Sequence, residues 1–297
     1  MNERKKHKSG FVNIIGNPNV GKSTLMNHLV GERLSIITSK AQTTRHRILG
    51  IVSEEDYQIV FSDTPGVIKP AYEMQEGMMS FVRQAFQDAD VLLYMVEIGD
   101  KILKDATFMH KIKTTDIPVL LLINKIDRSN QEKLIEEVTH WKETLPKAEI
   151  IPISALEGFN IETVKELIIE RLPESPAFYP KEALTDKPER FFVNEAIREK
   201  ILLNYKKEIP YSVEVETDLF KEDEKMIRIH ANVYVERNSQ KGIIIGHQGK
   251  MLKKTATEAR LDLEKFFQKK IFLELFVKVN KDWRKNKKQL KRFGYEN

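Results

Sequence analysis

The chain has 297 residues, 41% hydrophobic and 31% charged, with a net charge of +5. This is the composition of a globular protein long enough for two domains, and no apolar run is long enough to span a bilayer. The chain has no cysteine, which excludes disulfides and thiolate metal sites. Met1–Lys8 is basic but lacks the apolar core of a signal peptide, so we expect a cytoplasmic protein.

The charge is distributed unevenly. Residues 1–173 carry 22 basic and 24 acidic side chains, whereas residues 174–297 carry 27 and 20. Within the second part, residues 237–297 have 17 basic and only 6 acidic side chains. A solvated basic face is one interpretation, but so strong an excess predicts a polyanionic partner, with nucleic acid ahead of a membrane surface.

A phosphate-binding loop is predicted near the start of the chain. An apolar stretch at residues 11–15 has the pattern of a strand, and residues 24–29 have that of a helix. Between them lies the pattern G-x-x-x-x-G-K-[ST], whose backbone N–H groups would surround a polyphosphate. Lys22 would reach the outer phosphates, and the Ser23 hydroxyl would face Mg²⁺. The residues expected at the nucleotide are Gly16, Asn17, Pro18, Asn19, Val20, Gly21, Lys22, Ser23 and Thr24. A glycine-rich turn that binds nothing is disfavoured because the strand and the helix are both in register.

A second nucleotide-contacting loop is predicted at Asp63-Thr64-Pro65-Gly66, followed by Val67. The strand at residues 57–61 ends just before it. A carboxylate at Asp63 would hold the Mg²⁺ shell, and the Gly66 N–H would approach the terminal phosphate.

Specificity for guanine is predicted at Asn124-Lys125-Ile126-Asp127. Two near-continuous apolar runs, residues 91–96 and 119–123, predict buried parallel strands, and this motif ends the second of them. Asp127 would accept two hydrogen bonds from guanine, which adenine cannot donate. A later strand ends in Ser154-Ala155, whose backbone would contact the guanine oxygen.

These motifs, in this order, resemble the G domain of translation-factor-class GTPases. The amino-acid sequences of the phosphate loop and of Gln42-Thr43-Thr44-Arg45 resemble those of the Era family. The resemblance implies a doubly wound, Ras-like P-loop GTPase domain with a mostly parallel sheet. It also implies catalytic roles for Lys22, Thr44 and Gly66 and Mg²⁺ held by Ser23, Thr44 and Asp63, with Thr43 as a rival to Thr44.

Two further positions bear on hydrolysis. Val67 stands where a Ras-like enzyme has the glutamine that orients the attacking water, and valine cannot do this. Asn19 matches a position that ligates K⁺ in related GTPases, so K⁺ is a candidate second cation.

The second half of the chain has a different pattern. Residues 174–190 are rich in proline and predict an extended linker. The pattern then predicts a helix, two strands in which apolar and polar residues alternate, and a short apolar helix. Gly246-His247-Gln248-Gly249, a long helix and a last strand follow. This is the layout of an α+β type II KH domain, in which G-x-x-G brings the backbone close to single-stranded RNA. The residues predicted to bind RNA are Lys241, Ile243, Ile244, Gly246, His247, Gln248, Gly249, Lys250, Lys253 and Lys254.

A G domain at residues 1–173, a linker and a KH domain with a basic tail at residues 191–297 together form the architecture of the Era family. The resemblance implies a monomer that binds and slowly hydrolyses GTP. It implies binding to the 3′ end of small-subunit ribosomal RNA and a role in assembling that 30S-type subunit. Lysines follow Trp283 where many family members have acidic residues, which leaves the contacts of the tail open.

Two other functions remain open from sequence: an RNA scaffold with incidental GTP turnover, and a cell-cycle switch peripheral to the inner face of the cell membrane. Hydrolysis rate, its activator and the RNA register are not determined by sequence.

Overall fold

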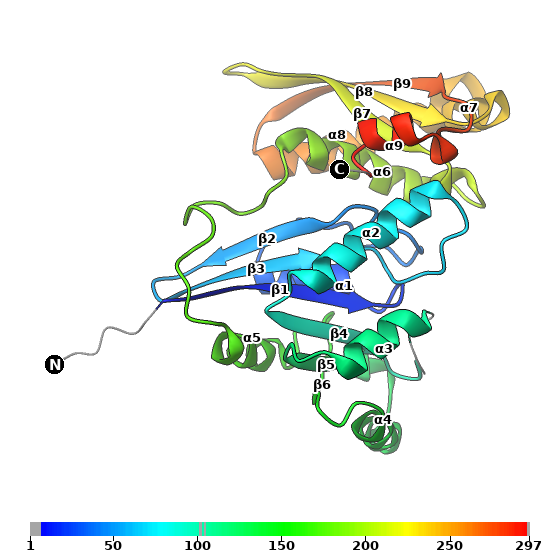
Figure 1. Cartoon of the computed structure of the whole chain (residues 1–297). Helices are drawn as coiled ribbons and strands as arrows, with labels where there is room; N and C mark the ends of the chain where they lie inside the picture. Colours follow the sequence, from blue (N-terminus) through cyan, green and yellow to red (C-terminus); the bar gives the residue numbers. More distant parts are fainter. Residues whose placement is uncertain (1–6, 101–102, 104, 296–297) are drawn as a thin grey trace. The chain divides into compact units, whose positions relative to one another are not determined.

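The computed structural model describes residues 7–100, 103 and 105–295, so most of the basic N-terminal stretch lies outside the described residues. Its contacts divide the chain into two compact units (Figure 1). The first ends at Asp186; the second begins at Lys187 and also includes Tyr72–Gly77. Within the described ranges, no helix is both long and apolar enough to cross a bilayer.

The first unit contains a six-stranded sheet in the order β2-β3-β1-β4-β5-β6. Only the pairing of β2 with β3 is antiparallel. The strands are β1 (Lys8–Gly16), β2 (Ile48–Ser53), β3 (Tyr57–Asp63), β4 (Val91–Glu97), β5 (Val119–Asn124) and β6 (Glu149–Pro152). The β4 side chains from Val91 to Val96 are almost completely buried, because helices cover both faces of the sheet. The predicted doubly wound, mostly parallel sheet is therefore confirmed.

Helices follow most strands of this sheet, as expected of parallel connections. They are α1 (Lys22–Val30), α2 (Glu73–Gln87), α3 (Ala106–Thr114), α4 (Gln131–Thr144) and α5 (Ile161–Arg171), with a short 3₁₀ turn, η1 (Ile126–Arg128). α1 packs against β1, β2, β3 and α5.

The carboxyl ends of the central strands meet at one edge of the sheet. In the register, Asp63 of β3 pairs with Ile14, and Gly16 of β1 pairs with Met95 of β4. The chain leaves β1 between these two neighbours, at the point where the strand order reverses. Ligands of doubly wound sheets bind in the crevice at such a point.

The connector packs along the first unit up to Asp186. The side chain of Gln58 accepts hydrogen bonds from the backbone N–H groups of Phe178 (2.8 Å) and Tyr179 (3.0 Å). Thr185 Oγ1 donates to the Leu49 carbonyl at 2.7 Å, and the Leu49 N–H donates to Asp186 at 3.0 Å. The extended conformation agrees with the proline-rich composition, but most of the connector is attached to the first unit.

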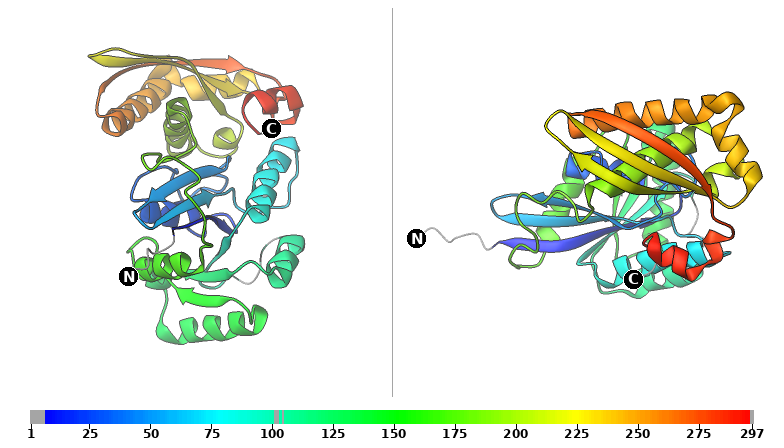
Figure 2. Two further views of the ribbon diagram at one scale, coloured as in Figure 1. Left: turned by 60° about the vertical axis from the view of Figure 1, so that its left-hand side comes forward. Right: turned by 90° about the horizontal axis from the view of Figure 1, so that it is seen from above.

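The second unit has a three-stranded sheet in the order β7-β8-β9. β8 pairs antiparallel with β7 and parallel with β9, and helices α6 and α8 pack together beside it (Figure 2). The elements are α6 (Glu189–Asn204), η2 (Ile209–Tyr211), β7 (Glu214–Glu222), β8 (Met226–Val235), α7 (Asn238–Ile245), η3 (His247–Gly249), α8 (Lys250–Phe267) and β9 (Lys270–Val279). This is the predicted order of a type II KH domain.

The basic C-terminal segment is folded rather than a free tail. It contains η4 (Trp283–Lys285) and α9 (Lys287–Arg292). Trp283 is completely buried, and its indole N–H donates to the Ser212 carbonyl at 3.2 Å. Tyr295 is also buried and donates its hydroxyl to Glu214 at 2.6 Å. In the sequence this segment is distinguished by its lysines, whereas its burial depends on the aromatic residues Trp283 and Tyr295.

Candidate functional site

The predicted phosphate loop joins β1 to α1 and has the conformation that the motif requires. Gly21 has φ +106°, and a Cβ there would lie 2.3 Å from Nδ2 of Asn124. Asn19 also has a positive φ, of 67°. Lys22 is buried and its ammonium donates to the carbonyls of Asn17 (2.9 Å) and Gly16 (3.3 Å). Burial lowers the pKa of Lys22 to about 8, partly offset by the nearby Asp63 carboxylate.

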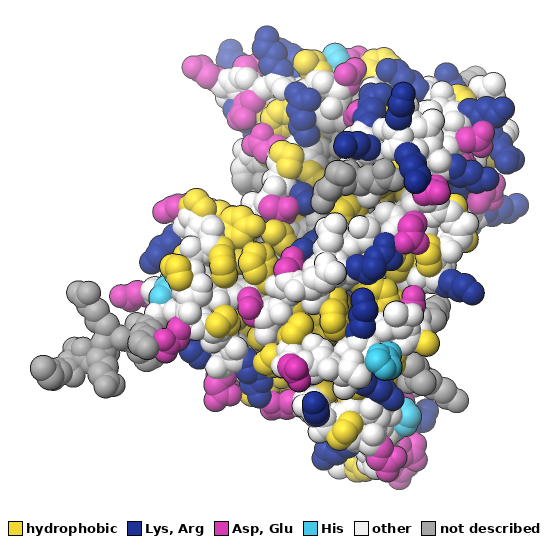
Figure 3. All heavy atoms as spheres, in the orientation of Figure 1, with side chains coloured by type: hydrophobic (Ala, Val, Ile, Leu, Met, Phe, Trp, Pro, Cys, Tyr) yellow, Lys and Arg dark blue, Asp and Glu magenta, His cyan; other side chains and the backbone are white. Residues whose placement is uncertain are grey.

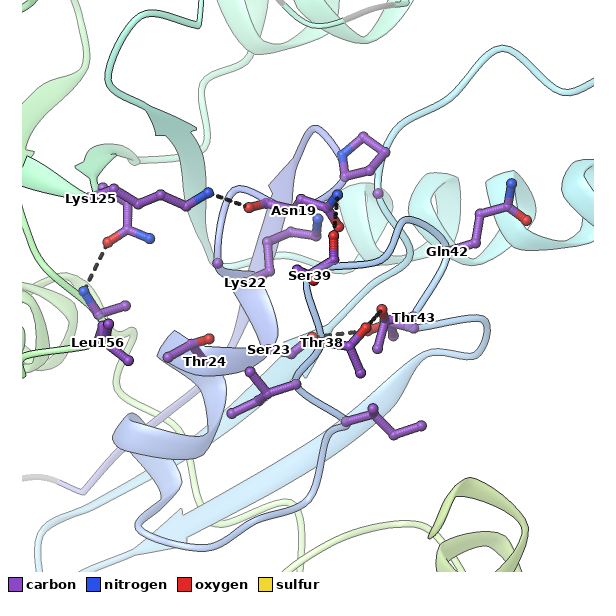
Figure 4. A pocket seen from close by; sticks show the side chains of 18 of the residues that line it. Asn19, Lys22, Ser23, Thr24, Thr38, Ser39, Gln42, Thr43, Lys125 and Leu156 are labelled. Atoms are coloured by element: carbon purple, nitrogen blue, oxygen red, sulfur yellow. Dashed lines mark hydrogen bonds between the residues drawn. The ribbon is translucent and has the colours of Figure 1, made fainter. Parts of the chain in front are cut away.

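A pocket of about 440 Å³ opens beside this loop (Figure 4). Eleven of the predicted nucleotide residues line it, together with Thr44: Pro18, Asn19, Gly21, Lys22, Ser23, Thr24, Gly66, Asn124, Lys125, Asp127 and Ala155. Seven further lining residues were not predicted from the sequence: Ile36, Ile37, Thr38, Ser39, Gln42, Arg128 and Leu156. Thr43, the rival to Thr44, also lines the pocket. Most of these come from the irregular segment between α1 and β2, whose path has no periodicity that a sequence reveals.

Three side chains from different elements converge at one end of the pocket. Ser23 Oγ donates to a carboxylate oxygen of Asp63 at 2.8 Å and lies 2.9 Å from Thr44 Oγ1. Thr44 Oγ1 also donates to Asp63, at 3.2 Å. The second carboxylate oxygen of Asp63 is buried and has no hydrogen-bond partner among the described residues.

The environment of Asp63 suits a divalent cation. Burial raises the pKa of this carboxyl, although the Lys22 charge and the hydroxyls of Ser23, Ser35 and Thr44 act in the opposite direction. A cation beside the unpartnered oxygen would remove the desolvation penalty. Two hydroxyls and one carboxylate form an oxygen-only set, which Mg²⁺ prefers.

Thr43, the rival for the role of Thr44, points elsewhere. Its hydroxyl donates to the Lys40 carbonyl at 2.6 Å and lies 2.8 Å from the hydroxyl of Thr38 (Figure 4). The geometry therefore favours Thr44 as the hydroxyl directed at Ser23 and Asp63.

The predicted base-recognition residues form a connected network. Asn124 donates to the Val20 carbonyl at 2.7 Å and accepts from the Ala155 N–H at 2.8 Å, which joins three loops. Lys125 donates to the Asn19 carbonyl at 2.7 Å (Figure 4). Ser154 holds Asp127 through a 2.6 Å hydrogen bond to one carboxylate oxygen. The structure thus brings Asn124–Asp127 and Ser154-Ala155, both predicted to contact guanine, to the phosphate loop.

The remaining predicted nucleotide residues lie behind the pocket surface and do not line it: Gly16, Asn17, Val20, Asp63, Thr64, Pro65, Val67 and Ser154. Val67 is fully buried, and its N–H donates to the Gly16 carbonyl at 3.0 Å. Thr64 donates its hydroxyl to the Ile14 carbonyl at 2.7 Å. These side chains shape the loops from within.

The predicted RNA loop connects α7 to α8 in the second unit. Gly246 has φ +72°, Gln248 +51° and Gly249 +76°. A Cβ on Gly246 would lie 2.7 Å from Cβ of Met251, whereas Gly249 has open space around it. His247, Gln248 and Lys250 are exposed. The loop therefore presents backbone and cations to solvent, as recognition of a phosphate backbone requires.

The two isoleucines of α7 that were predicted to bind RNA, Ile243 and Ile244, differ in burial. Ile243 is 50% exposed, but Ile244 is completely buried in the core of the second unit. The carbonyl of Ile244 accepts a hydrogen bond from the Tyr205 hydroxyl at 2.8 Å. Consecutive residues of a helix face directions about 100° apart, so they cannot share one surface. Ile244 is a core residue.

Lysines surround this loop. Lys250, Lys253 and Lys254 are exposed and Lys241 is half-buried, with Lys254 3.8 Å from Glu258. On the face in Figure 3, Lys and Arg side chains are dense over the second unit.

Two family models match the chain. The model described as 50S ribosome-binding GTPase matches residues 11–125, and the KH domain model matches residues 208–284. GTPase Era of Alkaliphilus metalliredigens is 47% identical over 98% of this chain and 99% of its own length. GTPase Era of Staphylococcus haemolyticus is 42% identical over 98% of both.

The chain belongs to the Era family of GTPases. It is accordingly a GTP-binding enzyme that hydrolyses GTP, with a KH domain that binds RNA. Two solved structures of Era, each 36% identical, superpose with a TM-score of 0.93 over 98% of this chain and all of theirs. One is Era with MgGDPNP and nucleotides 1506–1542 of 16S ribosomal RNA; the other is a variant of Aquifex aeolicus Era bound to GDP·AlF₄⁻.

Proposed function

We propose that this enzyme binds GTP as its Mg²⁺ complex in the pocket beside Lys22. The supporting observation is the convergence of Ser23, Thr44 and Asp63 with one unpartnered carboxylate oxygen. These three residues would hold the cation, which neutralises charge on the phosphates when it is bound. Lys22 would release the loop carbonyls and donate to the phosphates, and the Gly66 N–H would bind the terminal one.

Guanine recognition is assigned to Asp127, held by Ser154, and to the backbone of Ala155. Asn124 and Lys125 would keep these groups at a fixed distance from the phosphate loop, because both donate to its carbonyls. A pre-ordered carboxylate selects guanine, since adenine would leave it unpaired. The assignment can be tested by measuring the affinities of the Asp127→Asn variant for XTP and GTP. The variant should prefer XTP to GTP, and an unchanged preference for GTP would contradict the assignment.

The side chain of residue 67 cannot orient the attacking water during GTP hydrolysis in this site. Val67 is completely buried, so it has no access to the pocket. Slow turnover is therefore expected, and K⁺ near Asn19 is a candidate source of extra charge. Equal turnover in Na⁺ and K⁺ buffers would overturn the K⁺ proposal.

The RNA that this KH domain is proposed to bind is the 3′ end of small-subunit ribosomal RNA. The full-length similarity to an Era structure with 16S ribosomal RNA supports this choice. The 50S description belongs to a model that matches only residues 11–125, so it carries less weight for the RNA partner. We further propose a monomer that acts in the cytoplasm on assembly of the small subunit.

A binding experiment tests the RNA assignment. A labelled 3′-terminal oligonucleotide and a scrambled one of equal length would be titrated with the full chain, with a non-hydrolysable GTP analogue or with GDP. We expect tighter binding of the native oligonucleotide and further strengthening by the GTP analogue. Equal affinity for both oligonucleotides would overturn the proposed target but not RNA binding itself.

A further inference from the structure

Arg47 makes an unusually complete set of contacts close to the nucleotide pocket. Its guanidinium donates to both carboxylate oxygens of Asp88, at 2.6 and 3.0 Å. Its Nε donates to the hydroxyl of Ser62 at 2.7 Å. A bidentate pair with a third hydrogen bond fixes the position and plane of a guanidinium far better than a single contact.

The partners of Arg47 lie on two strands of the first unit and directly after α2. Ser62 is buried on β3, directly before Asp63. Asn13 is buried on β1, donates to Asp88 at 2.7 Å and accepts from Arg47 at 3.4 Å. Asp88 follows the last residue of α2. The cluster therefore joins two central strands to the end of α2.

A second contact links the same segments. The ring of His46 lies 5.8 Å from the ring of Phe81, which is on α2 and 8% exposed. α2 begins after the loop that contains Gly66. Residues 46 and 47 thus connect the segment that carries Thr44 to the helix that follows Gly66.

We infer that Arg47 is a positioning residue for GTP hydrolysis, which holds Thr44 at the Ser23–Asp63 cluster and couples this loop to α2. Only two residues separate Thr44 from Arg47, so their Cα atoms are at most about 11 Å apart. A fixed Arg47 therefore restricts where Thr44 can lie. This inference rests on the proposed role of Thr44 in the Mg²⁺–GTP site.

A purely structural ion pair is the alternative. Asp88 has a side-chain exposure of 42%, and pairs open to solvent contribute little to stability. The two roles differ in what they change. A structural pair alters thermal stability alone, whereas a positioning residue alters kcat and the preference for GTP over GDP.

The test compares Arg47→Ala, Arg47→Lys and Asp88→Asn with the unaltered chain. Arg171→Ala is the matched control, because Arg171 also pairs with a carboxylate, that of Glu149, at the start of β6. For each protein, kcat, KM, the affinities for GDP and for GDPNP with Mg²⁺, and Tm would be measured. Thr44→Ala is included to test the underlying assignment.

We expect Arg47→Ala to lower kcat by about ten- to a hundredfold and to weaken GDPNP binding, with GDP affinity changed less than about twofold. Arg47→Lys should recover only part of kcat, since an ammonium cannot reproduce the bidentate pair and the Ser62 bond together. Asp88→Asn should show a smaller effect in the same direction.

Two results would overturn the inference. One is turnover by Arg47→Ala and Arg47→Lys within about twofold of Arg171→Ala while Thr44→Ala is impaired. The other is a fall in Tm with unchanged kcat and GDPNP-to-GDP ratio. If Thr44→Ala is itself unimpaired, the proposed Mg²⁺–GTP site fails instead. If Arg47→Ala does not fold, Arg47→Lys and Asp88→Asn decide the matter by the same ratios.

Discussion

The hydroxyl of Thr44 lies 2.9 Å from the hydroxyl of Ser23, although the two residues are 21 positions apart in the sequence. Both hydroxyls also contact Asp63, at the end of a strand adjacent to β1. The loop between α1 and β2 is therefore folded onto the phosphate loop, with one of its two consecutive threonines directed into the cluster.

The two threonines should differ sharply in function. Thr44→Ala removes a hydroxyl from the proposed cation site, so we expect GTP turnover to fall by about ten- to a hundredfold. Thr43→Ala removes contacts with Thr38 and Lys40, away from Ser23 and Asp63, and should retain most of its activity. Steady-state hydrolysis with saturating Mg²⁺ measures both. Equal losses in the two variants would contradict the assignment.

Nucleotide affinity should depend on pH through Lys22. Burial lowers the pKa of this ammonium to about 8, and bound phosphates would raise it again. Below that pH the proton is present in both states, so affinity is constant. Above it, binding must take up a proton, and affinity falls by up to about tenfold per pH unit.

Calorimetric titration with GDP from pH 7 to about pH 9 tests this sign. In Lys22→Arg the side chain stays charged over the whole range, so whatever affinity remains should lose this dependence. A flat profile for the unaltered chain would show that Lys22 is already protonated throughout, or does not contact the phosphates.

The double variant Gly246→Asp, Gly249→Asp should bind RNA at least about a hundredfold more weakly, because carboxylates would face phosphates. GTP turnover in the absence of RNA should be unchanged. Gln268→Asp is the matched control: residue 268 has φ +51° and is exposed, at the far end of α8. An 18-residue helix places it about 27 Å from the loop. Loss of RNA binding in the control as well would indicate a general charge effect.

Substitutions of the two adjacent isoleucines on α7 should affect the stability of the fold and RNA binding separately. Ile244→Ala empties a fully buried position and should cost about 2–5 kcal/mol of the free energy of unfolding. Ile243→Ala should change it by less than about 0.5 kcal/mol, because this side chain is half exposed. RNA affinity should fall for Ile243→Ala if this face contacts bases. Denaturant unfolding and RNA titration of both variants provide the comparison, and a reversed order of the two stabilities would refute it.

Local sequence patterns were sufficient to predict a structural feature wherever that feature depends on a single segment of the chain. The continuous apolar runs of β4 and β5 predicted buried parallel strands, since only strands covered on both faces are apolar at every position. The glycines at 16 and 21, and those at 246 and 249, indicated loops with close backbone approach. These features depend on residues within a few positions of one another.

Where several segments meet, the sequence was less informative. The side chain of Ile244 turns into the core while that of Ile243 does not, and Trp283 inserts beside Ser212 instead of following its basic neighbours outward. Such outcomes depend on the surfaces contributed by distant elements. The residues next to Ile244 or Trp283 in the sequence do not indicate which distant surfaces these side chains will contact.

The sequence by itself determined that this chain has a nucleotide loop specific for guanine and a G-x-x-G loop within a basic segment, because each motif is contiguous. Only the tertiary structure decided that Thr44, and not Thr43, meets Ser23 and Asp63, and that Arg47 is held by Asp88, Ser62 and Asn13. The physical reason is that hydrogen bonds depend on the direction of side chains in space. That direction is set by the packing of β1, β3 and α2 around the loop.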